Sequence, residues 1–153
     1  MRPLRCGEIP GQPNLPHPQQ PHRGNRCESR GHRGRQLNPA FAATRAIDGD
    51  TDTEWATNGD GDDGSITIDL GTTQPIAGVE FLTRSMADGT SITDTYTVTV
   101  DDGGAHGPFP AGTVADPRFR DLETIGRRLR FDVETSTGGN VSAVEIRVYG
   151  PSG

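Results

Sequence analysis

The sequence has no lysine, two cysteines and few aromatic residues, which account for 5% of its 153 positions. It also has no run near the 18 or so consecutive apolar residues that a membrane-spanning helix requires. The charged start of the chain is not followed by an apolar core, so no signal peptide is visible. These absences predict a chain that does not span a membrane.

The two cysteines and most histidines are confined to the first third of the chain. Cys6 and Cys27 stand 21 residues apart with no neighbouring cysteine, a spacing that supports neither a disulfide framework nor a zinc motif. After residue 37 the only histidine is His106. No Ser-His-Asp arrangement, phosphate-binding glycine loop or histidine-rich metal motif is present. We therefore expect no catalytic activity.

The net charge of −6 conceals two segments of opposite charge. Residues 1–37 hold seven arginines and two glutamates, a net charge of +5, together with six of the twelve prolines. Residues 38–153 hold eight arginines and 19 acidic residues, a net charge of −11. We expect residues 1–37 to be a disordered tail, because they hold too few apolar side chains to offset the ordering entropy. The acidic body argues against nucleic acid as a partner, because phosphate binding needs a basic face.

Alternating apolar and polar residues recur through the body of the chain, and each run is bounded by Gly, Pro, Asn or Asp. No amphipathic helix of ten or more residues is present. This pattern predicts an all-β antiparallel sandwich or barrel over residues 38–150, followed by a short tail at residues 151–153. We expect strands at residues 65–70, 79–82, 96–100, 128–134 and 144–148, with weaker ones near 109–114 and 119–122.

An acidic loop at residues 48–54 precedes the only tryptophan, Trp55. Its opening resembles an EF-hand, but the sixth and twelfth positions hold Thr53 and Gly59 where that motif needs Gly and Glu. Two interpretations remain from composition alone. The aspartates are solvated turn residues, or they supply oxygen ligands to a hard cation such as calcium.

Three motifs in order resemble the discoidin family, also called coagulation factor 5/8 type C domains. They are A-I-D-G-D-x-x-T-x-W ending at Trp55, I-x-I-D-L-G ending at Gly71 and A-V-E-I-x-V-Y-G ending at Gly150. Bacterial members are family 32 carbohydrate-binding modules. The resemblance spans residues 38–150 and implies a galactose-binding-like jelly roll. The Pro/Arg-rich tail occupies the place of the strand with which members normally begin.

The resemblance also implies a structural calcium site. Its ligands are the carboxylates of Asp48 and Glu145, the hydroxyl and carbonyl of Thr53, and the carbonyls of Arg45, Asp50 and Val144. Such a set of oxygens suits calcium and ties the first loop to the last strand. By the same resemblance, Asp52 and Glu54 point outward and Trp55 belongs to the core.

Carbohydrate is the ligand that the resemblance implies, held by loops at one end of the sandwich. A sugar needs an apolar platform beside polar partners for its hydroxyls. The candidates are Arg84, His106, Phe109 and Asn58. Three of them have an alternative role: Arg84 as a surface charge, His106 as a solvated loop residue, and Phe109 as a cover for the core edge.

Two further interpretations of the function stay open. The same family supplies protein-binding modules for cell adhesion, and an accessory domain without a sugar site would have the same sequence pattern. Competition by free monosaccharides would favour carbohydrate binding over both. Salt-sensitive binding through the acidic face would favour a protein partner. The resemblance implies an extracellular location.

Overall fold

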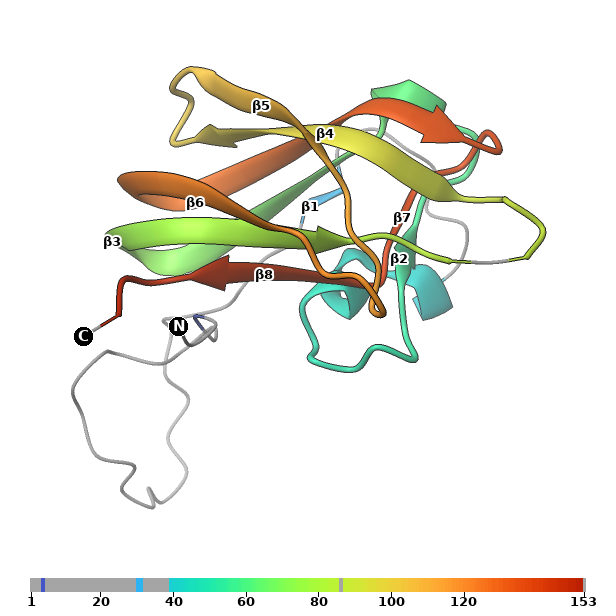
Figure 1. Ribbon diagram of the computed structural model, residues 1–153, viewed down its shortest axis with the longest axis horizontal. Helices are drawn as coiled ribbons and strands as arrows, with labels where there is room; N and C mark the ends of the chain where they lie inside the picture. Colours follow the sequence, from blue (N-terminus) through green and yellow to red (C-terminus); the bar gives the residue numbers. More distant parts are fainter. Residues whose placement is uncertain (1–3, 5–29, 32–38, 86, 153) are drawn as a thin grey trace, which may run out of the picture.

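Two long, bent strands organise the fold. The computed structural model describes Leu4 and residues 30–31, 39–85 and 87–152. β3 (Ser65–Leu82) and β6 (Phe119–Thr137) pair antiparallel along most of their length, with a register shift between Asp69 and Gln74. At this shift both strands turn a corner and continue in a second layer, as Figure 1 shows for the green and orange ribbons. One strand pair therefore contributes to both layers of a sandwich.

The first layer holds the beginning of β3 and the end of β6. Its hydrogen-bonded order is β1-β3-β6-β4-β5, where β1 is Arg30–Gly31, β4 is Ile92–Val100 and β5 is Ala105–Pro110. In the second layer the other halves of β3 and β6 are joined by β8 (Glu145–Tyr149), which pairs with the end of β3. Short elements complete the fold: 3₁₀ helices η1 (Pro39–Phe41), η2 (Ala43–Ala46) and η3 (Gly61–Asp63), and the pair β2 (Trp55–Ala56) with β7 (Ser142–Ala143).

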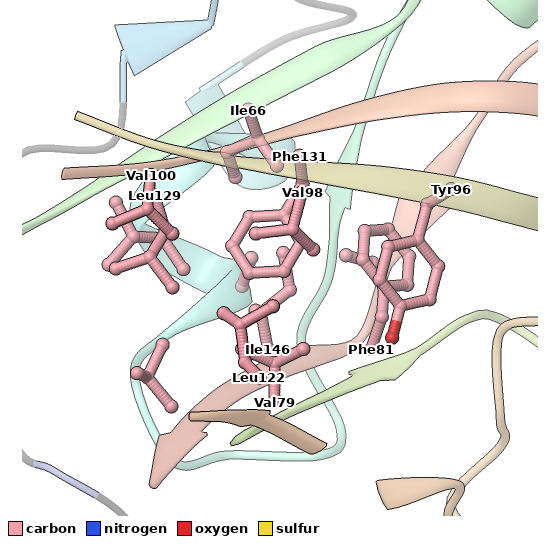
Figure 2. Close-up of a cluster of buried hydrophobic side chains, with 14 of the residues drawn as sticks. Ile66, Val79, Phe81, Tyr96, Val98, Val100, Leu122, Leu129, Phe131 and Ile146 are labelled. Atoms are coloured by element: carbon pink, nitrogen blue, oxygen red, sulfur yellow. The ribbon is translucent and has the colours of Figure 1, made fainter. Parts of the chain in front are cut away.

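The hydrophobic core fills the space between the two layers, as Figure 2 shows. Phe81 of the second layer stacks on Tyr96 of the first, with ring centroids 4.9 Å apart, and Phe131 lies 6.1 Å from Phe81. Trp55 is 4% exposed and belongs to this cluster, which confirms its predicted core position. These large side chains bury more apolar area per residue than the aliphatic residues around them.

The all-β antiparallel sandwich predicted from the alternation is confirmed, and the described residues contain no α-helix. Two details differ. Residues 65–70 and 79–82 are the two ends of one strand, and residues 119–122 are continuous with 128–134. The strand expected near 109–114 is β5, which lies earlier, at Ala105–Pro110. The alternation is interrupted at each corner, so a period-2 pattern divides each long strand into two.

Two parts of the N-terminal segment contact the sandwich. Arg30 and Gly31 form β1 and pair with Thr67 and Ile66 of β3, ahead of the expected domain start at residue 38. The main-chain N–H of Leu4 donates a 2.6 Å hydrogen bond to the carbonyl of Val148, and its half-buried side chain packs against the core. The remaining residues of the expected disordered tail lie outside the described part of the chain.

Candidate functional site

The acidic loop is a tight turn built by its own side chains. Oδ1 of Asp48 accepts a 3.0 Å hydrogen bond from the N–H of Asp50, and Oδ1 of Asp50 accepts one of 2.9 Å from Asp52. Gly49 has a φ of +78°, a conformation that residues with a side chain rarely adopt. Asp is common in such turns because its side chain bonds the backbone two residues on.

Oxygen atoms of three predicted calcium ligands meet inside this loop. The Thr53 hydroxyl donates to Oδ2 of Asp48 at 2.8 Å and lies 3.1 Å from the carbonyl oxygen of Asp50. The guanidinium of Arg45 lies 3.5 Å from the same Oδ2 of Asp48. One carboxylate oxygen of Asp48 is therefore shared between a hydroxyl and a cationic side chain.

Glu145 reaches this loop from the first position of β8. Its Oε2 accepts a 3.2 Å hydrogen bond from the N–H of Gly49, and the residue is only 6% exposed. Burial, the largest influence, acts with the charges of Asp48 and Asp50 to raise the pKa of Glu145 to about 7, although Gly49 and Arg147 lower it. The negative charge of Glu145 is thus poorly compensated by the protein.

The donor set of this loop fits a hard divalent cation. Among the described residues no three His, Cys, Asp or Glu side chains gather as a metal site, so a cation would depend on main-chain and hydroxyl oxygens as well. Asp48 and Glu145 supply two carboxylates, and Thr53 with the Asp50 carbonyl supplies neutral oxygens beside them. Calcium accepts such mixed and flexible oxygen shells. A cation would also compensate the buried charge of Glu145.

The two remaining predicted ligands flank the loop. Arg45 lies in η2, where its N–H donates to the carbonyl of Ala42. Val144 joins β7 to β8, and its N–H donates to the carbonyl of Leu82. These bonds fix the main chain on both sides of the loop. The structure thus brings all six predicted ligand residues to one end of the sandwich.

A pocket of about 740 Å³ opens beside this loop. Figure 1 shows its surroundings, where the teal loop before β2 and the orange segment between β5 and β6 lie near the start of β8. Four segments and two single residues line the pocket: residues 40–41, 51–54, 83–85 and 113–115, with Arg45 and Val144.

An ion pair spans the pocket lining. The guanidinium of Arg84, just beyond β3, lies 3.4 Å from Oε1 of Glu54, and the two side chains are 23% and 15% exposed. Burial raises the pKa of Glu54, although the charge of Arg84 lowers it. The expectation that Glu54 points outward is wrong, because its carboxylate turns toward Arg84. Asp52, which was also expected to point outward, is exposed.

Apolar surface lies next to this ion pair. Phe41 is the one aromatic residue among those described as lining the pocket, and Val114, which also lines it, is 50% exposed. The pocket therefore combines an apolar wall with a charged donor and acceptor. The sequence interpretation missed Phe41, Glu54 and Val114. Phe41 could have been noticed as an aromatic residue outside every alternating run.

The other predicted ligand-binding residues lie elsewhere. His106 and Phe109 are on β5, paired with Val98 and Tyr96. His106 is exposed, whereas Phe109 packs edge-on against Tyr96 at 5.9 Å and covers the core. Asn58 is exposed in the turn after β2. Of the four candidates, only Arg84 lines the pocket.

Comparison with known proteins identifies the class and the family. The double-layered, antiparallel β-fold is that of galactose-binding-like modules. The sequence profile of the F5/8 type C domain matches residues 28–146. The chain belongs to the F5/8 type C domain family. A comparison with curated protein sequences found no match.

Three solved structures illustrate the similarity of fold. The family 32 carbohydrate-binding module of C. perfringens NanJ, in complex with galactose, has a TM-score of 0.63 at 16% identity, over 78% of this chain and 92% of that one. The lectin domain of lectinolysin, complexed with Lewis B antigen, has a TM-score of 0.64 at 17% identity, over 82% and 94%. A chitosan-binding module from a Paenibacillus sp. IK-5 chitosanase/glucanase has a TM-score of 0.63 at 20% identity, over 81% and 95%. No helix in the described part of this chain is long and apolar enough to cross a membrane.

Proposed function

We propose that this chain is a non-catalytic carbohydrate-binding module that holds its ligand in the pocket beside the acidic loop. The observation that carries the proposal is the Arg84–Glu54 ion pair next to Phe41 and Val114. A sugar presents an apolar face and a rim of hydroxyls, so its binding site needs apolar surface beside paired polar groups. Arg84 donates to hydroxyl oxygens and Glu54 accepts from hydroxyl groups.

The solved structures of the same fold support a sugar ligand. They include complexes with galactose, with Lewis B antigen and with GalNAc-β-1,3-galactose. Identities of 16–23% extend the fold to this chain but not the choice of sugar. Glycans of this kind occur outside cells, which supports an extracellular place of action.

Binding without catalysis is the simplest use of this pocket. Glycoside hydrolysis normally needs two carboxyl groups flanking the scissile bond, one acting as acid and one as base or nucleophile. Here Glu54 is held by Arg84, while Asp52 on the same loop is exposed. The ion pair keeps Glu54 as a hydrogen-bond acceptor, a role that suits ligand recognition.

We further propose that a calcium ion stabilises the acidic loop. Asp48 and Glu145 would hold it with Thr53 and with the carbonyls of Arg45, Asp50 and Val144. The hydrogen bond from Gly49 to Glu145 supports this assignment, because it brings the last strand to the first loop. The ion would supply positive charge to the buried carboxylate and fix one wall of the pocket.

A glycan array probed with the full chain, in calcium and again in EDTA, tests the carbohydrate proposal. We expect one class of glycan to bind, with competition by its free sugar. Arg84→Ala should lose that binding, whereas Arg128→Ala should keep it, because Arg128 lies at the opposite end of β6 and is 62% exposed. A blank array from a cooperatively melting protein would refute carbohydrate as the ligand and favour a protein partner.

A further inference from the structure

We infer that the acidic loop couples the two proposed sites, so that a cation on Asp48 releases Arg45 to the pocket and favours ligand binding there. This inference rests on the proposed function and names the regulation of the same pocket. The coupling is carried by the chain's own contacts, and it makes cation and ligand binding mutually dependent.

The two sites share residues. Arg45, Thr53 and Val144 belong to the predicted calcium shell and also line the pocket. Glu54, the acceptor of the Arg84 ion pair, directly follows Thr53 in the chain. A change in the position of Thr53 therefore moves the wall of the pocket. Neighbouring residues on one tight turn cannot adjust independently, because the turn is held by its own side-chain hydrogen bonds.

The coupling would act through the side chain of Arg45. Its guanidinium lies 3.5 Å from Oδ2 of Asp48, and its side chain is 45% exposed, so solvent reaches much of it. A divalent cation and a guanidinium compete for this carboxylate oxygen, and like charges repel at short range. The main-chain N–H of Arg45 is bonded to the carbonyl of Ala42, so the proposed movement is one of the side chain alone. It already lines the pocket.

Glu145 adds the second half of the coupling. It draws the loop toward β8 through Gly49, and a cation between Glu145 and Asp48 would tighten this closure. Thr53 and Glu54 would then be held against Arg84 at the end of β3. Thermodynamic linkage requires the effect to be reciprocal: a ligand that binds the closed pocket raises the affinity for the cation by the same factor.

Chemical modification of arginine with phenylglyoxal tests the movement of Arg45 without any sugar. The full chain is treated with and without calcium, and the rate is read for each arginine by peptide mass spectrometry. We expect calcium to speed the modification of Arg45 severalfold, because Asp48 no longer protects it. Arg128 is the internal control and should react at one rate in both conditions. An unchanged or slower rate at Arg45 would overturn the inference.

An Asp48→Ala variant distinguishes the release of the Arg45 side chain from a general loosening of the fold. Its Arg45 should react quickly with and without calcium, while the melting curve shows whether the variant is folded. If Asp48→Ala fails to fold, Asp48→Asn serves the same purpose with less change in shape. A protected Arg45 in the folded variant would show that Asp48 is not its partner and would overturn the inference.

The last experiment measures the coupling between cation binding and glycan binding directly. For the glycan that binds the array most strongly, affinity should fall at least about fivefold in EDTA, the lower end of usual coupling between sites. Arg45→Ala should make this difference smaller, because the loop closure through Glu145 remains in that variant. Equal affinities in calcium and EDTA would overturn the coupling even if Arg45 moves. A blank array would refute the proposed carbohydrate function, whereas the Arg45 modification rates would still decide the cation-linked movement.

Discussion

The main-chain N–H of Gly49 donates a 3.2 Å hydrogen bond to the Glu145 carboxylate, joining positions 96 residues apart in the chain. This contact places the acidic loop against the first residue of β8. Because Glu145 is buried and its pKa is raised to about 7, the contact alone does not compensate its charge. The proposed calcium ion would supply the missing positive charge.

Replacing Glu145 with Gln tests the calcium site. The amide keeps a similar shape and can still accept the hydrogen bond from Gly49, but it removes the negative charge. We expect the melting temperature of the variant to be the same in calcium and in EDTA. The wild type should gain about 2.7 kcal/mol at a calcium concentration of 100 times its dissociation constant. Scanning calorimetry checks this, and an undiminished calcium response in the variant would exclude Glu145 as a ligand.

The ion pair between Asp69 and Arg127 predicts a pH dependence of stability. Burial raises the pKa of Asp69, but hydrogen bonds from Arg127, the Gly71 N–H and Arg128 outweigh it and hold the pKa below its usual value. The ionised carboxylate therefore stabilises the fold above its unfolded-state pKa of about 4. That contribution is lost as the pH falls through the lower, folded-state pKa.

We accordingly expect Asp69→Asn to cost up to about 1 kcal/mol at neutral pH, the range of partly exposed ion pairs. The difference from the wild type should shrink as the pH falls below about 4. Urea denaturation at several pH values measures it. A difference that stayed constant down to the acid limit would mean that the charge of Asp69 has no part in stability.

A glycine at the corner of β6 should tolerate no side chain. A methyl group at Gly126 would collide with the side chain of Val100 and come within 3.0 Å of the Asp101 carboxylate. We expect Gly126→Ala to destabilise the protein by about 1–3 kcal/mol through overpacking. Gly104→Ala is the matched control in the β4–β5 turn, because nothing lies within 4 Å of a side chain there. Equal stabilities of the two variants would contradict the described corner.

Leu4 provides a test of the N-terminal contact. Its N–H bonds to Val148, and its side chain covers Gly150 next to the core. Truncating a fully buried Leu to Ala typically costs 2–5 kcal/mol, and a half-buried one less, so we expect a loss of about 1–2 kcal/mol for Leu4→Ala. Ile125→Ala is the control, since Ile125 is 68% exposed. Chemical denaturation of the full chain compares the two, and equal stabilities would contradict this packing.

The sequence predicts the sheet better than its corners. Ile66, Ile68, Leu129 and Phe131 alternate with polar residues, and all four face the core as expected. The alternation of apolar and polar residues predicts on which face of the sheet a side chain lies, because neighbouring side chains on a strand point to opposite sides. It does not report where a strand bends, because a corner is set by contacts such as that between Gly126 and Val100.

The candidate site could be predicted only where local motifs define it. The loop around Asp48 follows from turn chemistry, and its contact with Glu145 follows from the family resemblance. The pairing of Glu54 with Arg84 was not predicted, because the two residues lie 30 positions apart and meet only after β3 has turned its corner. The sequence left two roles open for Phe109, ligand binding and covering the core, since an aromatic near a loop has the same sequence signature in both; in the structure it packs against Tyr96.

A nuclear magnetic resonance titration of the full chain, with the sugar of the strongest array glycan, tests the central claim most directly. The account predicts chemical-shift changes at Phe41, Glu54, Arg84 and Val114, which line the pocket. Shifts centred instead on His106 and Phe109 of β5 would contradict this site and move the ligand to another face. The absence of shifts at saturating sugar would contradict carbohydrate binding itself.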